Sequence, residues 1–229
     1  MAVGVVIASF GERPYLGQLI ETCCDLPVAL YTDRDRGYPV SKLHIVPDGS
    51  HQGPRGPIRM TNRILAEAAD FDPILCLNDD MKIVSPNFLE GFALAERFGV
   101  CVPMNPRIYV KYNAMGADAP ADLPETPLYG TACNVSPMFV SRARPGVRVF
   151  MEAYVRQLET CQRGTLAFWL ASWETGFCPL YLPEQWCVCE GNAAYWKAYT
   201  KRLRGQDYRI EPIMLHWGQA GVREVFDAK

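Results

Sequence analysis

The chain has 229 residues, of which 49% are hydrophobic and 21% charged, so it holds enough apolar material for a sizeable core and is not a disordered protein. Its net charge of -2 and pI near 6.0 lack the overall basicity of proteins that bind nucleic acid or membranes. No basic region precedes the first short apolar run, and no segment approaches the roughly 20 apolar residues of a membrane helix. We therefore expect neither a signal peptide nor a membrane span.

The cysteines indicate a reducing compartment. There are nine, an odd number, and several fall inside apolar runs where free thiols act as small hydrophobic side chains. Their close pairs do not have the two-residue gap of a zinc knuckle. We expect reduced thiols and a cytoplasmic location.

Short apolar runs alternate with amphipathic or turn-rich stretches through the first half of the chain. The apolar runs predict strands at residues 3–10, 27–32, 42–46 and 100–103, and a strand from residue 74 that ends in the polar triplet 78–80. Helical spacing of apolar residues predicts helices at residues 13–24, 57–69 and 87–98. This alternation predicts an α/β fold with a Rossmann-like, mostly parallel sheet in three α/β/α layers.

The second half is less regular. We expect a strand at 134–142, one broken helix or two over 147–174, a strand with turns at 178–188 and a basic amphipathic helix at 192–205. A segment rich in proline, alanine and acids, residues 117–127, is typical of an exposed loop. Because no composition shift marks a boundary, residues 1–229 are interpreted as one domain.

The buried run "ILCLNDDMKI" ends its apolar part at Asn78, Asp79 and Asp80. In parallel sheets ligands bind at the carboxyl ends of the strands, where these side chains are expected. Successive residues of a strand point to opposite sides, so one of the two carboxylates is expected to be the main ligand. Hard oxygen donors suit Mg²⁺ or Mn²⁺. The alternative is that the pair caps a turn and binds nothing.

The triplet Asn78-Asp79-Asp80 resembles the acidic D-x-D triplet that ends a central strand in nucleotide-sugar glycosyltransferases of the GT-A fold, with Asn in the first acidic place. Neighbouring features resemble that family in the same order. "ASFGERPYL" is similar to the loop around the nucleotide base, and "YTDRD" to the acid that contacts base or ribose. "GPRGPIRMTNRIL" is similar to the segment before the triplet, and "MLHW" supplies a late histidine.

The resemblance implies a nucleoside-diphosphate sugar as donor, with Mn²⁺ or Mg²⁺ held by Asp80 and His216. Residues 1–103 would be the nucleotide-sugar-binding half and residues 104–229 the acceptor-side half. Packing beside Trp217 is the alternative for His216. The positions that the resemblance implies for donor and cofactor binding are Ser9, Phe10, Glu12, Asp33, Arg55, Arg59, Asn62, Asn78 and Asp79.

Together these features predict a metal-dependent glycosyltransferase. Negative charge grows on the leaving diphosphate, and a divalent ion held by Asp80 would offset it, with Arg59 or Arg55 donating to phosphate oxygens. An inverting enzyme also needs a carboxylate base, and Glu174 is the nearest candidate. Aromatic neighbours are expected to raise its pKa by desolvation.

Several alternatives stay open on the acceptor side. The aromatic residues around Glu174 could be core and Glu174 itself a surface residue, and a retaining mechanism needs no such base. Further sugar or acceptor candidates are Tyr129, Gly130 and Asn134. The acceptor is a glycan, a small molecule or modified DNA, and in the last case phosphate contacts would come from Lys197, Lys201, Arg202 and Arg204. His44 and His51 are interpreted as structural or solvated.

Two other classes of protein compete with the transferase. A sugar-phosphate nucleotidyltransferase has a glycine-rich basic loop after its first strand, to which "SFGERPYLG" corresponds poorly. A non-catalytic binder of nucleotide sugars or nucleic acid would keep binding residues without the chemistry. The sequence leaves the donor base and the oligomeric state open.

Overall fold

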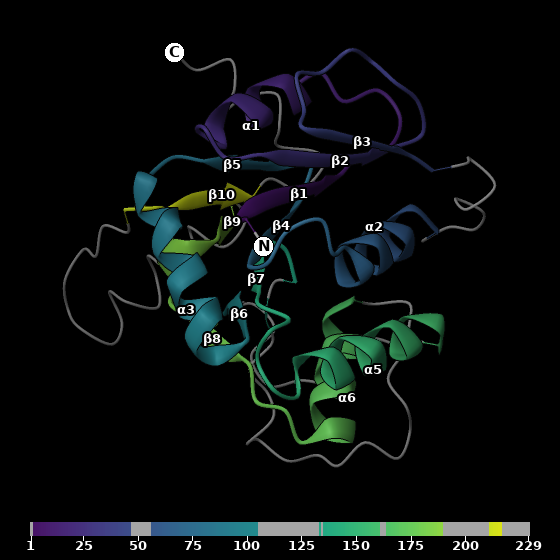
Figure 1. Ribbon diagram of the computed structural model, residues 1–229, viewed down its shortest axis with the longest axis vertical. Coiled ribbons are helices and arrows are strands. Elements are labelled where there is room, and N and C mark those ends of the chain that lie inside the picture. Colours follow the sequence, from purple (N-terminus) through teal and green to yellow (C-terminus); the bar gives the residue numbers. More distant parts are fainter. Residues whose placement is uncertain are drawn as a thin grey trace.

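The computed structural model describes residues 2–46, 56–104, 133, 135–160, 164–189 and 211–216 (Figure 1). The strands are β1 (Gly4–Ala8), β2 (Val28–Thr32), β3 (Lys42–Ile45), β4 (Ile74–Asn78), β5 (Met81–Ile83), β6 (Val100–Pro103), β7 (Met138–Val140), β8 (Leu180–Leu182), β9 (Val188–Cys189) and β10 (Met214–His216). The helices are α1 (Leu16–Thr22), α2 (Gly56–Glu67), η2 (Pro86–Leu89), α3 (Glu90–Phe98), α5 (Val147–Thr160), α6 (Gly164–Thr175) and η6 (Glu184–Trp186).

The main sheet has seven strands in the order β3-β2-β1-β4-β7-β6-β8. Its neighbours are parallel except at β7, which runs antiparallel to both β4 and β6. A second sheet has the order β5-β10-β9. The predicted mostly parallel α/β/α fold is thereby confirmed.

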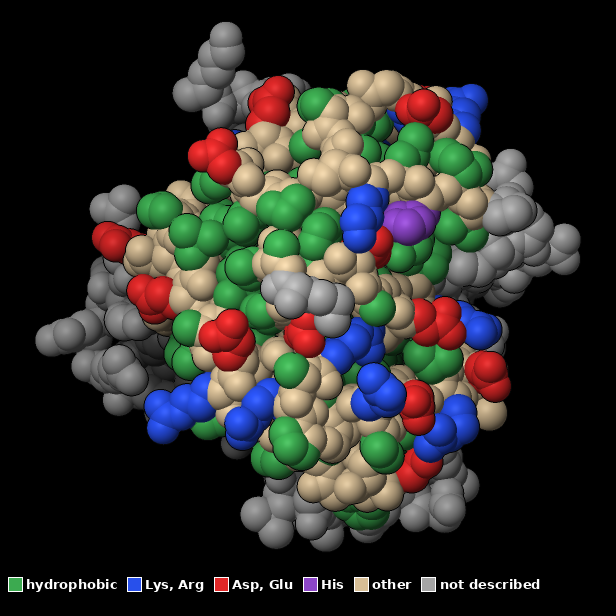
Figure 2. All heavy atoms as spheres, in the orientation of Figure 1, with side chains coloured by type: hydrophobic (Ala, Val, Ile, Leu, Met, Phe, Trp, Pro, Cys, Tyr) green, Lys and Arg blue, Asp and Glu red, His purple; other side chains and the backbone are tan. Residues whose placement is uncertain are grey.

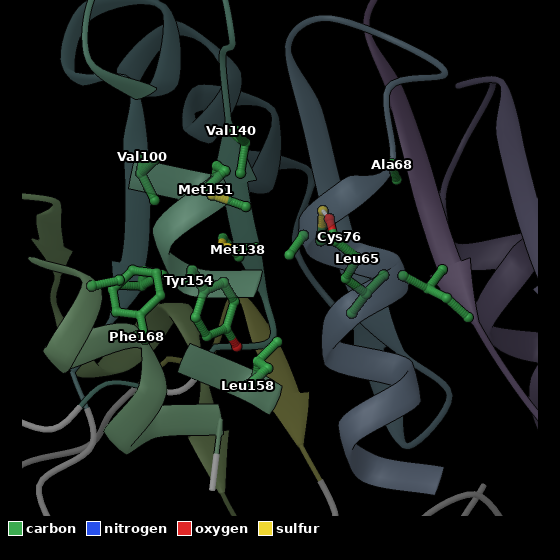
Figure 3. Close-up of a cluster of buried hydrophobic side chains, with 14 of the residues drawn as sticks. Leu65, Ala68, Cys76, Val100, Met138, Val140, Met151, Tyr154, Leu158 and Phe168 are labelled. Atoms are coloured by element: carbon green, nitrogen blue, oxygen red, sulfur yellow. Dashed lines mark hydrogen bonds between the residues drawn. The ribbon is translucent and has the colours of Figure 1, made fainter. Parts of the chain in front are cut away.

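Alternate side chains of the strands enter two separate cores, as the pleat of a buried strand requires. From β1, Val6 and Ala8 enter the core under α2, α5 and α6, whereas Val5 and Ile7 enter the core under α1 and α3. Figure 1 shows these two groups of helices on opposite sides of the sheet. Figure 3 shows side chains of α2, α5 and α6 meeting those of the strands in the first of these cores.

The run at residues 74–83 divides at the triplet 78–80, where the sequence predicted that the strand ends. β4 ends at Asn78, Asp79 and Asp80 form a turn, and β5 starts at Met81 in the second sheet. Both pieces are apolar because β4 is buried within the main sheet and Met81 and Ile83 pack in the core under α1 and α3. The acid pair therefore lies where the chain passes from one sheet to the other.

The expected helical stretch over 147–174 is the pair α5 and α6, which pack against each other. The predicted loop at 117–127 and the predicted basic helix at 192–205 lie outside the described residues. Among the helices that the structure describes, none is both long and apolar enough to pass through a membrane.

Candidate functional site

The order of strands creates a switch point between β1 and β4. From β1 the chain passes through α1 to β2 and β3 on one side, and β4 then returns to the other side of β1. α1 and α2 cover opposite faces of the sheet. In open α/β sheets the crevice at such a point, outside the carboxyl ends of the strands, is the usual place for a ligand. Ser9 and Asp79 directly follow the two strands concerned.

The loop after β1 is attached to the end of β2. Gly11 has a φ of +74°, which a glycine adopts without strain, and its N–H donates to Asp33 Oδ1 at 3.1 Å. Arg36 donates from Nη2 to both oxygens of Asp33, at 2.8 and 3.0 Å. Desolvation raises the pKa of Asp33, but these hydrogen bonds outweigh it and the pKa is lowered overall. Glu12, on the same loop, forms an exposed ion pair with Arg34.

The same loop is attached to the end of β4 through Asp79. Ser9 Oγ donates to Asp79 Oδ2 at 2.9 Å, and Arg13 Nε donates to the same oxygen at 2.8 Å. Burial raises the pKa of Asp79 and the charge of Asp80 adds to that shift, whereas Arg13 and Ser9 oppose it. The guanidinium of Arg13 therefore compensates part of the negative charge of Asp79.

Asp80 has different surroundings. Its Oδ1 lies 3.2 Å from His216 Nε2, yet it is a buried oxygen with no hydrogen-bond partner among the described residues. Asn78 Oδ1 is in the same condition, although the backbone N–H of Asn78 donates to Ser136 Oγ at 2.7 Å. Two buried oxygens without a hydrogen-bond donor destabilise the folded chain unless a cation or another donor binds them.

The second sheet brings His216 to this place. In the antiparallel pairing of β10 with β5, His216 is opposite Met81, the residue after Asp80. The structure therefore places His216 beside Asp80, and the binding of a metal by the two residues stays a prediction.

The donor set fits a divalent cation in its chemistry. Ligand atoms bound at about 2.1 Å and at right angles around one ion lie about 3 Å apart, close to the 3.2 Å between His216 Nε2 and Asp80 Oδ1. Asn78 adds a hard amide oxygen. No group of three or more histidine, cysteine, aspartate and glutamate side chains in the described ranges could hold a metal. A cation here would depend on the amide oxygen and on phosphate or water.

Of the other predicted positions, Phe10 and Asn62 are buried and several are not described. Phe10 is 9% exposed and belongs to the core under α2, α5 and α6. Asn62 is buried on α2 beside Gly164, the first residue of α6. Arg59 is part of α2 but its side chain is not among those described, and Arg55, His51, Tyr129, Gly130, Asn134 and the basic positions 197–204 lie outside the described residues.

Glu174 is not in the environment that the sequence predicted. Arg156 Nη2 donates to its Oε1 at 2.5 Å and Gln157 Nε2 to its Oε2 at 3.0 Å. These hydrogen bonds lower the pKa of Glu174, where aromatic desolvation was expected to raise it. The alternative of a surface residue is confirmed instead, because the side chain of Glu174 is 39% exposed and faces α5, while Phe168 and Trp169 turn into the core.

The course of α6 also separates Glu174 from the acid pair. Gly164 at its start packs beside Val135, next to the serine that binds Asn78. Phe177, just after its end, packs against Gly99, which precedes β6. Ten residues of helix span about 15 Å, so Glu174 lies toward the opposite edge of the sheet.

His44 has a structural position, as expected. Its ring stacks on Tyr31 with centroids 4.2 Å apart, and its Nε2 is 2.9 Å from Asp70 Oδ1. Lys42 Nζ lies 3.4 Å from the same oxygen. Figure 2 shows histidine and basic side chains next to acidic ones on the face of the molecule seen in Figure 1.

The residue that the sequence reasoning missed is Arg13. The basic character of its loop was visible in "SFGERPYLG", but nothing in the sequence indicated that Arg13 would reach Asp79, which is 66 positions away. Only the pairing of β1 with β4 makes them neighbours.

Solved structures of glycosyltransferases share this fold. The galactosyltransferase LgtC, in complex with donor and acceptor sugar analogues, matches 95% of this chain and 88% of its own with a TM-score of 0.54 and 12% identity. Mouse xyloside xylosyltransferase 1 matches 97% of this chain and 99% of its own, with a TM-score of 0.52 and 10% identity. The bifunctional glycosyltransferase WbbM gives a TM-score of 0.57 over 94% of this chain and 45% of its own, at 13% identity.

No family model matches the chain, and no curated protein is similar to it in sequence. At identities this low the structural likeness establishes the fold and nothing finer. The chain has the GT-A fold of nucleotide-sugar glycosyltransferases, as the resemblance of its acid triplet implied.

Proposed function

We propose that this protein is a metal-dependent glycosyltransferase, which moves a sugar from a nucleoside-diphosphate sugar to an acceptor hydroxyl. Two observations carry the proposal: Asn78 Oδ1 and Asp80 Oδ1 are buried without hydrogen-bond donors among the described residues, and Asp80 Oδ1 lies 3.2 Å from His216 Nε2. They lie at the switch point of a fold shared with glycosyltransferases.

Asp80, Asn78 and His216 are the residues that would hold a Mn²⁺ or Mg²⁺ ion. Such an ion offsets the negative charge that develops on the leaving diphosphate. Asp80 contributes a full negative charge, and His216 must be neutral to act as a ligand. Asn78 contributes an uncharged oxygen where the family commonly has an acid, so this set carries one charge less.

Donor binding is assigned to the loop after β1 and to the end of β2. Asp33 and Gly11 hold that loop in position, and the buried Ser9 secures it to β4 through Asp79. In this proposal residues 1–103 form the donor half, and residues 104–229 supply the acceptor side together with His216.

Calorimetry with UDP and with GDP, each with and without Mn²⁺, tests the proposal. Wild-type protein is expected to bind one of the two more tightly when Mn²⁺ is present. Asp80→Ala is expected to lose at least about tenfold of the Mn²⁺-dependent affinity, because a direct ligand to the ion is removed. Asp25→Ala, an exposed acid before β2, is the matched control and should bind as wild type does.

Equal affinity of the Asp80 variant and wild type in Mn²⁺ would contradict the metal site. Hydrolysis of a UDP- or GDP-sugar by the purified protein then separates an enzyme from a binding protein. A protein that binds the nucleotide with Mn²⁺ but never releases sugar from any donor would favour the non-catalytic alternative.

A further inference from the structure

The two adjacent acids have been given different partners by the fold. Asp79 Oδ2 accepts hydrogen bonds from Ser9 and Arg13, both from the segment that follows β1. Asp80 Oδ1 accepts none from the described residues. An oxygen already bound by a guanidinium is a poor cation ligand, since the arginine and the ion would repel each other. Asp79 therefore needs a role other than that of Asp80.

Arg13 uses only one of its N–H donors in the contact with Asp79. A guanidinium carries five N–H groups, and only the Nε–H of Arg13 is used, which leaves both terminal nitrogens without an acceptor among the described residues. The side chain is 38% exposed while Asp79 is 16% exposed. Asp79 thus fixes one side of the Arg13 guanidinium, and the terminal N–H groups of Arg13 remain for a ligand.

The position of Arg13 is fixed from two directions. The loop is anchored at Ser9, which is 1% exposed, and at Gly11, whose N–H is bound to Asp33. Asp79 and Asp80 form one turn at the end of β4, so an arginine held by Asp79 lies at the turn that carries Asp80. A planar guanidinium with open terminal nitrogens is well suited to phosphate oxygens.

We infer that Arg13 binds the diphosphate of the donor and that Asp79 is a positioning residue that holds Arg13 for this contact. This inference rests on the proposed function, since it assigns a second cationic contact to the same site. The two acids then have different roles: Asp80 binds the ion, and Asp79 orients Arg13.

The experiment is calorimetry of UDP and GDP binding, with and without Mn²⁺, on four variants and wild type. Arg13→Gln is expected to weaken binding about ten- to hundredfold, because a charge-assisted contact to phosphate is lost. The loss should be similar with and without Mn²⁺, so the enhancement by Mn²⁺ is retained, whereas Asp80→Ala removes that enhancement. Arg13→Lys should recover part of the affinity, since it restores the charge but not the planar fork.

Asp79→Asn tests the positioning role. It is expected to weaken binding in the same direction as Arg13→Gln, and the double variant should be no weaker than Arg13→Gln alone. Arg97→Gln, an exposed arginine in the last turn of α3, removes the same charge at the other edge of the sheet and should have no effect. Unfolding midpoints of each variant show whether the native fold is retained.

The three possible negative results overturn different parts of the proposal. Binding by Arg13→Gln within about twofold of wild type, in a folded variant, overturns the inference and leaves the proposed function standing. Wild-type affinity in folded Asp79→Asn overturns the positioning role. A wild-type protein that binds neither UDP nor GDP overturns both the inference and the proposed function.

Discussion

At the scale of single residues, neighbouring groups of the same type differ because the fold gives them different partners. Asp79 has an arginine and a serine on one oxygen, whereas Asp80 has an imidazole nearby and an oxygen without a donor. A buried carboxylate oxygen without a hydrogen-bond donor favours a bound cation over an empty site. The chemistry that we propose therefore depends on Asp80 and not equally on both acids.

Glu174 is bound to α5 and lies away from the proposed site. Glu174→Gln is expected to leave donor binding and turnover unchanged, because Glu174 is bound to Arg156 and Gln157 toward the edge opposite the acid pair. Loss of an exposed ion pair should lower the free energy of unfolding by less than about 1 kcal/mol. Sugar-nucleotide hydrolysis and urea denaturation measure the two effects, with Glu96→Gln on α3 as the control. A tenfold fall in turnover would restore Glu174 as the base.

At the scale of elements, the end of β4 was predictable from the sequence and the start of β5 was not. The strand from Ile74 was predicted to end in Asn78, Asp79 and Asp80, which are residue types that favour turns, and β4 does end at Asn78. The sequence did not indicate that Met81–Ile83 would form a strand of another sheet. β5 pairs with β10, which comes from the far end of the chain. The residues around Met81 therefore cannot reveal this pairing by themselves.

The packing of α3 against β7 gives a prediction at this scale. A Cβ at Gly91 would lie 2.3 Å from an atom of the Phe139 ring. That ring cannot move away easily, since it is fully buried and contacts Phe92 and Trp186 edge to face. Gly91→Ala is expected to lower the free energy of unfolding by about 1–3 kcal/mol, although alanine itself favours helix.

Gly17 is the matched control for Gly91. It is also the second residue of its helix, but its nearest neighbour, an atom of Tyr38, would lie at an ordinary 3.6 Å. Gly17→Ala should leave stability unchanged or raise it by up to about 1 kcal/mol. Urea denaturation of the two variants measures the difference. Equal stabilities would mean that α3 can move away from β7.

At the scale of the whole molecule, the sequence predicted the layers but not the neighbours. Alternating strands and helices with right-handed crossovers leave few arrangements of β1, β2, β3 and β4, so the carboxyl-edge site was predictable in outline. The partner of Asp79 was not predictable in this way, and His216 was placed with Asp80 only by the resemblance to the family. Arg13 and His216 lie 66 and 136 positions from them along the chain, and strand pairing in three dimensions decides their contact.

The two cores also predict how the molecule responds to alkaline pH. Burial raises the pKa of the thiols of Cys23, Cys76 and Cys101 from 9.0 to about 12. Below pH 9 these thiols are protonated in the folded and the unfolded chain, so their contribution to stability is fully present. Above pH 9 the unfolded chain releases protons that the folded chain keeps, and stability is lost until the folded thiols ionise near pH 12. Each thiol should then lower the free energy of unfolding by about 1.4 kcal/mol per pH unit.

Urea denaturation between pH 7 and pH 10.5, in excess reductant, measures this loss. The free energy of unfolding should be steady up to about pH 8.5 and fall steeply beyond it. Cys76→Ala, which removes a thiol that donates to Leu65 O at 3.4 Å, should show a shallower fall even though its stability at pH 7 is lower. A wild-type midpoint that is the same at pH 10.5 as at pH 8 would mean that these thiols meet solvent in the folded protein. The two-core packing around the sheet, which positions both β1 and β4 for the proposed site, would then be looser than the burial of these side chains implies.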